Sequence, residues 1–167
     1  MRTISETEVW EALAEVPDPE IPVVSVVDLG LVHRVELGGG RLRVELLPTF
    51  VGCPALELIR DSVAERLAGM APRVEVEMTF AVPWTSDRIT PGGREKLRQS
   101  GFAPPGPAAV VGDARPLFAT IAMRPTATCP WCGSADTALE NLFGPTLCRT
   151  VFWCNRCRQP FEQFKAV

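Results

Sequence analysis

The sequence predicts an α+β fold, in which a small mixed three-stranded sheet with helices packed on one face precedes a C-terminal zinc ribbon. Two observations predict this fold. Residues 5–100 show helical and strand periodicity in turn, including a strand, a helix and a strand in a row. Residues 129–157 contain two Cys-x-x-Cys pairs. The predicted boundaries are an α/β domain over 1–105, a proline-rich connector over 106–125 and the ribbon over 126–167.

The first predicted helix begins at a capping box. Ser5 and Glu8 have the spacing at which each side chain accepts a hydrogen bond from the other residue's backbone. Apolar residues then recur on one helical face up to Val16. Pro17 and Pro19 follow, and the residue before a proline avoids helical geometry. We therefore expect the helix to end near Val16.

Three strands are expected next. Residues 31–37 and 41–47 flank a turn of three glycines and are predicted to form a hairpin. Residues 74–80 alternate between apolar and polar side chains, which is typical of a half-buried strand. A helix over 55–67 separates the second strand from the third, so these two strands are expected to be parallel.

A weaker helix is predicted from residue 90 to just before Gly101. The composition then changes, because five prolines and two glycines occur between residues 104 and 125. Prolines stiffen a linker, and the apolar residues among them predict that this connector packs against other parts of the protein.

The charge balance excludes some function classes. The chain has 20 acidic and 17 basic residues, and residues 1–105 hold 16 acidic against 11 basic. The basic footprint of a nucleic-acid binder is therefore missing, and we expect no nucleic-acid partner. The N-terminus has no apolar signal region, and no apolar run approaches membrane-spanning length, so we expect no membrane partner and a cytoplasmic location.

The strongest motif is the pair of cysteine knuckles in the last 40 residues. Cys129 and Cys132 form the first, Cys154 and Cys157 form the second, and 21 residues separate them. In a reducing compartment this pattern is typical of a structural four-thiolate zinc ribbon. A rubredoxin-like iron or an iron–sulfur cluster on the same four thiols is the alternative. Four protein ligands leave no open position on a zinc ion, so we expect no catalysis there.

Two further residues have a structural and a functional interpretation. Cys148 is a fifth cysteine in the ribbon, and we expect it to pack beside aromatic residues, the alternative being a redox or metal-transfer role. His33 is the only histidine and falls on the apolar face of the first strand, where a structural role is expected.

Cys53 is the candidate reactive thiol of the first domain. It is the only cysteine before residue 129, and it lies between the second strand and the helix over 55–67. Pro54 suits the first helical position, so Cys53 is predicted to be the N-cap of that helix. The positive end of the helix dipole should then lower the pKa of the thiol and favour the thiolate. The alternative is a buried cysteine that only fills space.

Three carboxylates are candidates for the same site. Asp18 and Glu20 lie in a proline-rich turn, and Asp28 precedes Gly30. Ordinary loop chemistry is one interpretation of these carboxylates, and the family resemblance given below implies the other, in which they act as hard metal ligands or tune the Cys53 thiol. Covalent catalysis by Cys53 would need a neighbouring base. With one histidine in the chain we expect no enzyme activity.

The segments that carry these residues resemble a known family. Residues 18–22, 28–32 and 49–54, in this order, resemble the SufT-like family of iron–sulfur cluster assembly domains. With residues 83–87 and 101–105 and the ribbon segments 143–148 and 160–165, the whole chain resembles the PaaD family. That family comprises phenylacetate-degradation proteins in which this domain carries a C-terminal zinc ribbon.

The resemblance implies an assembly or maturation factor, not an enzyme. The implied client is the multicomponent phenylacetyl-CoA epoxidase, above all its iron–sulfur reductase. The implied cluster-binding, iron-binding or reactive thiol is Cys53, with Asp18, Glu20 and Asp28 as the family's acidic motifs. The cofactors implied are structural zinc on the four ribbon cysteines and a transient iron–sulfur cluster or iron.

Two mechanisms remain open at this point. A [2Fe–2S] cluster normally takes four protein ligands, so Cys53 alone would need a second copy (a homodimer), a client or small thiols to complete the set. The alternative is an adaptor or scaffold that docks the client to assembly machinery and carries only zinc. Two departures from the family pattern are noted: Val51 replaces a small polar residue near the thiol, and Ala166 replaces a cysteine at the tail.

Overall fold

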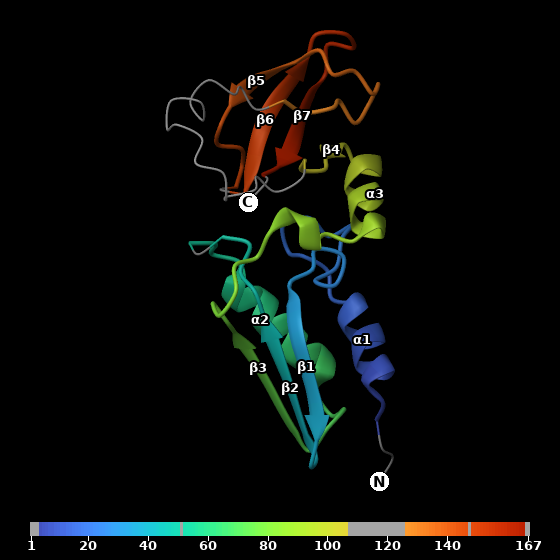
Figure 1. Ribbon diagram of the computed structural model, residues 1–167, viewed down its shortest axis with the longest axis vertical. Coiled ribbons are helices and arrows are strands. Elements are labelled where there is room, and N and C mark those ends of the chain that lie inside the picture. Colours follow the sequence, from blue (N-terminus) through green and yellow to red (C-terminus); the bar gives the residue numbers. More distant parts are fainter. Residues whose placement is uncertain (1–3, 51, 107–125, 147, 166–167) are drawn as a thin grey trace. The chain divides into compact units, whose positions relative to one another are not determined.

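The computed structural model describes residues 4–50, 52–106, 126–146 and 148–165. The chain divides into two compact units (Figure 1). The N-terminal unit comprises Met1–Trp84 and Arg88–Lys96, and the ribbon unit comprises Thr85–Asp87 and Leu97–Val167. Apart from Gly106, the predicted connector lies outside the described residues, as do Val51 and Ala166.

The N-terminal unit contains the predicted three-stranded mixed sheet. Its strands are β1 (Val32–Gly38), β2 (Arg41–Leu46) and β3 (Arg73–Met78), in that order across the sheet. β1 and β2 form an antiparallel hairpin, whereas β2 and β3 are parallel. The carboxyl ends of β2 and β3 therefore lie at the same edge of the sheet, opposite the β1–β2 turn (Figure 1).

The central strand shows why the sheet has one buried and one charged face. Leu42, Val44 and Leu46 are fully buried. Successive side chains on a strand point to opposite faces, so the residues between them face away from the core. Of these, Arg43 forms ion pairs with carboxylates of all three strands, including Glu45 at 3.1 Å. Ion pairs therefore cover the charged face of the sheet, and the helices pack on its apolar face.

Two helices bury the apolar face. The capping box of Ser5 and Glu8 is confirmed at the start of α1 (Glu6–Ala14). α2 (Leu56–Leu67) buries one apolar stripe of Ile59, Val63 and Leu67. It contacts β3, and α1 contacts α2. The helices therefore pack as predicted.

The segment after β3 contains a 3-10 turn, η1 (Ser86–Arg88), and the third helix, α3 (Pro91–Gln99). The Thr90 hydroxyl accepts a hydrogen bond of 2.9 Å from the N–H of Gly93 at the start of α3. Gly101 follows the helix with a φ of +83°, a conformation that favours glycine.

The ribbon unit contains a four-stranded sheet. Its strands are β4 (Phe102–Ala103), β5 (Thr137–Asn141), β6 (Arg149–Cys154) and β7 (Pro160–Phe164), in the order β4-β7-β6-β5. β5, β6 and β7 form antiparallel neighbours, while β4 runs parallel to β7. The second knuckle lies in the turn between β6 and β7.

The ribbon unit begins earlier in the chain than the boundary expected after residue 105. Residues 97–106 belong to it, because Phe102 and Ala103 pair with Glu162 and Gln163 of β7. The Gln163 amide also donates to the carbonyl of Pro104 at 3.4 Å. Two-residue strands of this kind have no signal of their own in the sequence.

Among the described residues, no helix has both the length and the apolar character required to cross a bilayer.

Candidate metal centre and thiol site

The two cysteine knuckles have the same backbone geometry. In the first, the N–H of Gly133 donates to the Cys129 carbonyl at 2.9 Å, and the N–H of Cys129 donates to the Ser134 carbonyl at 2.9 Å. In the second, Arg158 donates to Cys154 at 2.9 Å and Cys154 donates to Gln159 at 3.0 Å. Gly133 and Arg158 both have a positive φ, of 70° and 56°. This turn closes each knuckle so that both of its thiols face one point.

The four sulfur atoms converge as a metal site requires. All lie within 4.8 Å of one another. The distance is 3.6 Å between the Sγ atoms of Cys129 and Cys157, and again 3.6 Å between those of Cys132 and Cys154. A tetrahedral zinc ion with bonds of about 2.3 Å separates its sulfur ligands by about 3.8 Å. These residues therefore fit a four-thiolate metal ion of the zinc-ribbon type.

One thiol is already disposed to lose its proton. The N–H of Cys157 lies 3.5 Å from the Cys154 sulfur, and this hydrogen bond is the main reason that the pKa of Cys154 falls to about 7. Donation from backbone N–H groups is common to thiolate ligands, because it stabilises negative charge on sulfur.

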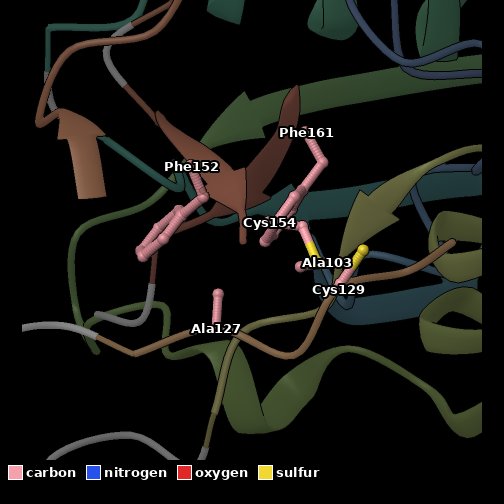
Figure 2. Close-up of a cluster of buried hydrophobic side chains, with 6 residues drawn as sticks. All are labelled: Ala103, Ala127, Cys129, Phe152, Cys154 and Phe161. Carbon is pink, nitrogen blue, oxygen red and sulfur yellow. The ribbon is translucent and has the colours of Figure 1, made fainter. Parts of the chain in front are cut away.

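A small apolar core supports the metal site (Figure 2). Phe152 of β6 and Phe161 of β7 stack with ring centroids 5.6 Å apart. Both rings are buried together with Cys129, Cys154 and two alanines. A cluster of this size cannot hold a module of about 40 residues by itself, so the metal must contribute much of the stability.

Cys148 lies outside this cluster. Its sulfur is 3.2 Å from the Thr146 hydroxyl, and its carbonyl accepts a hydrogen bond from Lys165 at 2.9 Å. The group of four thiols that the described residues bring together does not include it. Cys148 is therefore a suitable control for substitutions of the metal ligands.

Cys53 lies before α2 but is not its N-cap, which corrects the prediction. The N-cap is Ala55, which makes no side-chain capping bond, and the helix begins at Leu56. The carbonyl of Ala55 accepts the first helical bond, from Ile59 at 2.9 Å. Cys53 instead occupies a turn in which its N–H donates to the Phe50 carbonyl at 3.1 Å.

The pKa of Cys53 is raised, whereas the sequence predicted a lowered one. Burial of the half-exposed thiol is the largest cause. The N–H groups of Ala55 and Leu56 act in the expected direction, but the carboxylates of Glu20 and Asp18 oppose them. Desolvation and negative neighbours both disfavour a thiolate. A raised pKa favours the protonated thiol at neutral pH.

Asp18 and Glu20 thus belong to the electrostatic surroundings of Cys53. Asp18 also has a structural task, since one oxygen accepts hydrogen bonds from the N–H groups of Glu20 at 2.9 Å and Ile21 at 2.8 Å. This Asx-type turn fixes the proline-rich segment that presents the Glu20 side chain.

Asp28 is engaged in a different set of contacts. One oxygen lies 2.6 Å from the Lys96 ammonium and accepts hydrogen bonds from the N–H and the hydroxyl of Ser25. Burial alone would raise the pKa of Asp28, but Lys96 and Ser25 together lower it. These contacts indicate a structural role in joining the turn over 25–30 to α3.

Sequence reasoning missed three residues, in α3 and in the segment that precedes it, that contact the turn over 25–30. The Trp84 indole donates to the Leu29 carbonyl at 2.9 Å, and the Arg88 guanidinium donates to the Gly30 carbonyl at 3.0 Å. Lys96 is the third such residue. The only signal for these contacts in the sequence was Trp84, because a buried tryptophan generally needs a hydrogen-bond partner.

His33 is half-buried and lies beside an irregularity in the β1–β2 pairing between Val32 and Arg34, which is consistent with a structural residue.

Comparison with known proteins identifies the family. Residues 6–78 match the model of the iron–sulfur cluster assembly protein family, and residues 113–165 match the PaaD zinc beta ribbon domain. The chain is 36% identical over 162 residues to a putative subunit of the 1,2-phenylacetyl-CoA epoxidase of Escherichia coli K12. That match covers 96% of this chain and 92% of the relative. The chain belongs to the PaaD family.

Solved structures resemble just over half of this PaaD-family chain. A DUF59 domain of unknown function from Bacillus anthracis is 27% identical with a TM-score of 0.52, covering 55% of this chain and 90% of that one. A conserved hypothetical protein from Thermotoga maritima is 33% identical with a TM-score of 0.50, covering 58% and 98%. Those two chains are matched almost completely.

A first prediction concerns the Cys53 thiol of this PaaD-family protein. Its alkylation by iodoacetamide should have a pH midpoint above that of a free cysteine, because burial and two carboxylates raise its pKa. Glu20→Gln removes one negative charge and should shift the midpoint down and accelerate alkylation at neutral pH. Peptide mass spectrometry resolves Cys53 from Cys148. Glu65→Gln near the other end of α2 is the control, and an unchanged midpoint in Glu20→Gln would refute the assignment.

Proposed function

We propose that this protein is an accessory factor that assembles an iron–sulfur cluster, or transfers it or its iron, to a client of the phenylacetyl-CoA epoxidase system. The iron–sulfur reductase of that multicomponent enzyme is the proposed client, and the proposed setting is the cytoplasm, where thiols stay reduced. The family match over residues 6–78 and the name of the Escherichia coli relative support this role. The protein is proposed to act as a maturation factor, not as an enzyme.

The observation that carries the proposal is the charge environment of Cys53. Glu20 and Asp18 disfavour a bare thiolate, and the same two carboxylates favour a cation at the sulfur. A site of this kind stays protonated when empty and becomes a thiolate ligand only when a metal displaces the proton. Such a thiol is protected between deliveries and can bind iron when it arrives.

The proposed transfer is a ligand exchange. The Cys53 thiol loses its proton to solvent as an iron–sulfur bond forms, and a client thiolate later replaces it as that bond breaks. The oxidation state of the cargo does not change. Since a [2Fe–2S] cluster normally has four protein ligands, the other ligands must come from the client, a second copy or small thiols. This shortage of ligands favours transient transfer over storage.

The four ribbon thiols would hold a resident zinc ion, which would fix the fold of the ribbon and carry no part of the transfer. Their 3.6 Å sulfur separations support that assignment.

The adaptor function is the second candidate, and one observation favours it. A thiol with a raised pKa is a weaker metal ligand at neutral pH than an activated one. An adaptor would bind the client and assembly proteins and would use Cys53 only to shape the turn before α2.

The experiment compares wild type, Cys53→Ser and Cys148→Ser after the ribbon has been loaded with zinc. The carrier function predicts a visible charge-transfer band on anaerobic reconstitution with iron and sulfide, lost only in Cys53→Ser. It also predicts that the client reductase contains less iron–sulfur cluster in a strain that carries Cys53→Ser. A fully loaded client in that strain excludes the carrier, and a colourless wild type that still binds the client favours the adaptor.

A further inference from the structure

The first cysteine knuckle carries an exposed tryptophan. Trp131 immediately precedes Cys132 and is 55% exposed. It is one of three large apolar side chains that are exposed among the described residues of the ribbon unit. The other two, Leu142 and Phe143, follow the end of β5. Because β5 begins opposite Cys154, these two residues lie at the end of the sheet away from the knuckles.

Two contacts hold the exposed indole in place. Its N–H donates to the Pro160 carbonyl at 3.4 Å. A Cβ on Gly101 would lie 2.3 Å from the Cη2 atom of Trp131, so the ring packs directly on the backbone of Gly101. The ring is therefore held in one orientation although more than half of it is exposed. A rigid aromatic side chain loses little conformational freedom when a partner covers it.

The second knuckle carries two exposed arginines. Arg156 occupies the position that corresponds to Trp131, immediately before the last cysteine of its knuckle, and Arg158 follows that cysteine. Both side chains are exposed. Within the described ranges of the chain, neither arginine forms an ion pair. Their guanidinium groups can therefore take a carboxylate from outside the chain.

Carboxylates of the ribbon have other partners. Glu162 forms an ion pair with Arg149 at 2.8 Å. Asp136 accepts a hydrogen bond of 2.8 Å from the side-chain amide of Asn155. Neither carboxylate neutralises the arginines of the second knuckle.

We call Trp131, Arg156 and Arg158 the knuckle surface. The four sulfur atoms lie within 4.8 Å of one another, and Figure 2 shows Cys129 and Cys154 of the two knuckles side by side. The three residues therefore come from the same end of the ribbon unit. Tryptophan and arginine are the residue types that most often carry the binding energy of protein interfaces. A guanidinium group binds a carboxylate with two parallel hydrogen bonds.

The charge of the ribbon disfavours the other occupants. Residues 126–167 contain four basic and three acidic side chains, and four thiolates on one divalent ion add an excess of negative charge. Affinity for nucleic acids comes from many phosphate contacts, whereas this surface offers two arginines. A second copy that docked through the same surface would place arginines against arginines. A protein with exposed carboxylates is the occupant that remains favourable.

We propose that the knuckle surface is the docking surface for a component of the phenylacetyl-CoA epoxidase system, and that this component presents an apolar pocket flanked by carboxylates. The proposal rests on the proposed function for the identity of the partner, but it makes no use of Cys53. The indole of Trp131 fills the pocket and supplies affinity, and the arginines supply orientation and a salt-dependent association rate. Docking and transfer are then tasks of different units.

The test measures the binding of each separately purified epoxidase component to the full chain after the ribbon has been loaded with zinc. Trp131→Gln should weaken the affinity for one component by at least about tenfold, because a central aromatic residue carries much of the binding energy. Arg156→Gln/Arg158→Gln should weaken the same affinity by a similar factor. The wild-type affinity should fall with added salt.

Two variants are matched controls and should bind like wild type. Leu142→Gln replaces an exposed apolar side chain at the other end of the ribbon sheet. Arg34→Gln/Arg73→Gln removes the same charge from exposed arginines of the N-terminal unit. The metal content of every variant is measured first and should equal that of wild type, because none of these residues is among the four converging thiols. If Trp131→Gln loses the metal, the variant of the two knuckle arginines decides the result.

The outcomes separate docking from the proposed function. The proposal is wrong if no component binds, or if the arginine variant binds like wild type. Loss of metal from that variant with unchanged affinity would show that the arginines only balance the charge of the metal centre. Retention on RNA, or a self-dimer that Trp131→Gln abolishes, would also overturn the proposal. Cys53→Ser should bind the component like wild type. If it also loads the component normally, docking stands and the carrier function is wrong.

Discussion

Replacing Cys154 by Ser should unfold the ribbon unit while the N-terminal unit stays folded. Cys154 is buried, supplies one of four converging sulfurs and is paired at 3.6 Å with Cys132. Structural zinc sites of this type contribute about 10–16 kcal/mol of apparent binding energy, which is more than a module with so small an apolar core can lose. Removal of the metal by a strong chelator should have the same effect.

Metal analysis and amide hydrogen exchange together measure this result. We expect about one bound metal ion per chain in wild type and none in Cys154→Ser, with protection lost over β5, β6 and β7 and retained over β1 to β3. Cys148→Ser is the matched control, since its sulfur lies outside the cluster, and it should keep the metal. A Cys154→Ser chain with full metal content and a protected ribbon would contradict the assignment of the ligands.

Replacing Gly30 by Ala should destabilise the N-terminal unit by about 2–5 kcal/mol. Gly30 has a φ of +64°, and a Cβ there would lie 2.3 Å from the carbonyl oxygen of Arg88. The obstacle is backbone, so it cannot rotate away as a side chain would. The added methyl group therefore has to displace the Arg88 segment, which carries the hydrogen bonds to the Gly30 and Val32 carbonyls.

Gly69→Ala provides the control for this prediction. Gly69 also has a positive φ, of 79°, but a Cβ there would meet nothing within 4 Å. Gly69→Ala should lower the free energy of unfolding by only about 1–2 kcal/mol, which is the cost of a positive φ for alanine. Urea denaturation of both variants measures the difference. Equal losses of stability in the two variants would show that the close approach of Gly30 to the Arg88 backbone does not matter.

The candidate site could be predicted from the sequence only in part. Cysteine spacing was sufficient for the metal centre, because a Cys-x-x-Cys turn forms from adjacent residues and two such turns can share one ion. The nearness of Asp18 and Glu20 to Cys53 was suggested by the family pattern alone. The direction of the Cys53 pKa was predicted wrongly, since Cys53 was expected to be the N-cap of the helix and the effect of the helix end was expected to outweigh burial.

Local interactions explain what the sequence alone determined about this protein. The capping box of α1, the alternation along β2, the parallel β2–β3 pair and the two knuckles each depend on residues close together in the chain or on a period that the chain displays. Such patterns identify helices, strands and metal ligands without knowledge of their surroundings.

Only the tertiary structure decided the roles of individual charged and reactive side chains. Asp28 pairs with Lys96, 68 residues away, β4 pairs with β7, and the Cys53 thiol is half-buried near two carboxylates. The physical reason is that desolvation and ion pairing depend on which distant groups the fold brings within a few ångströms, and no local pattern records that distance.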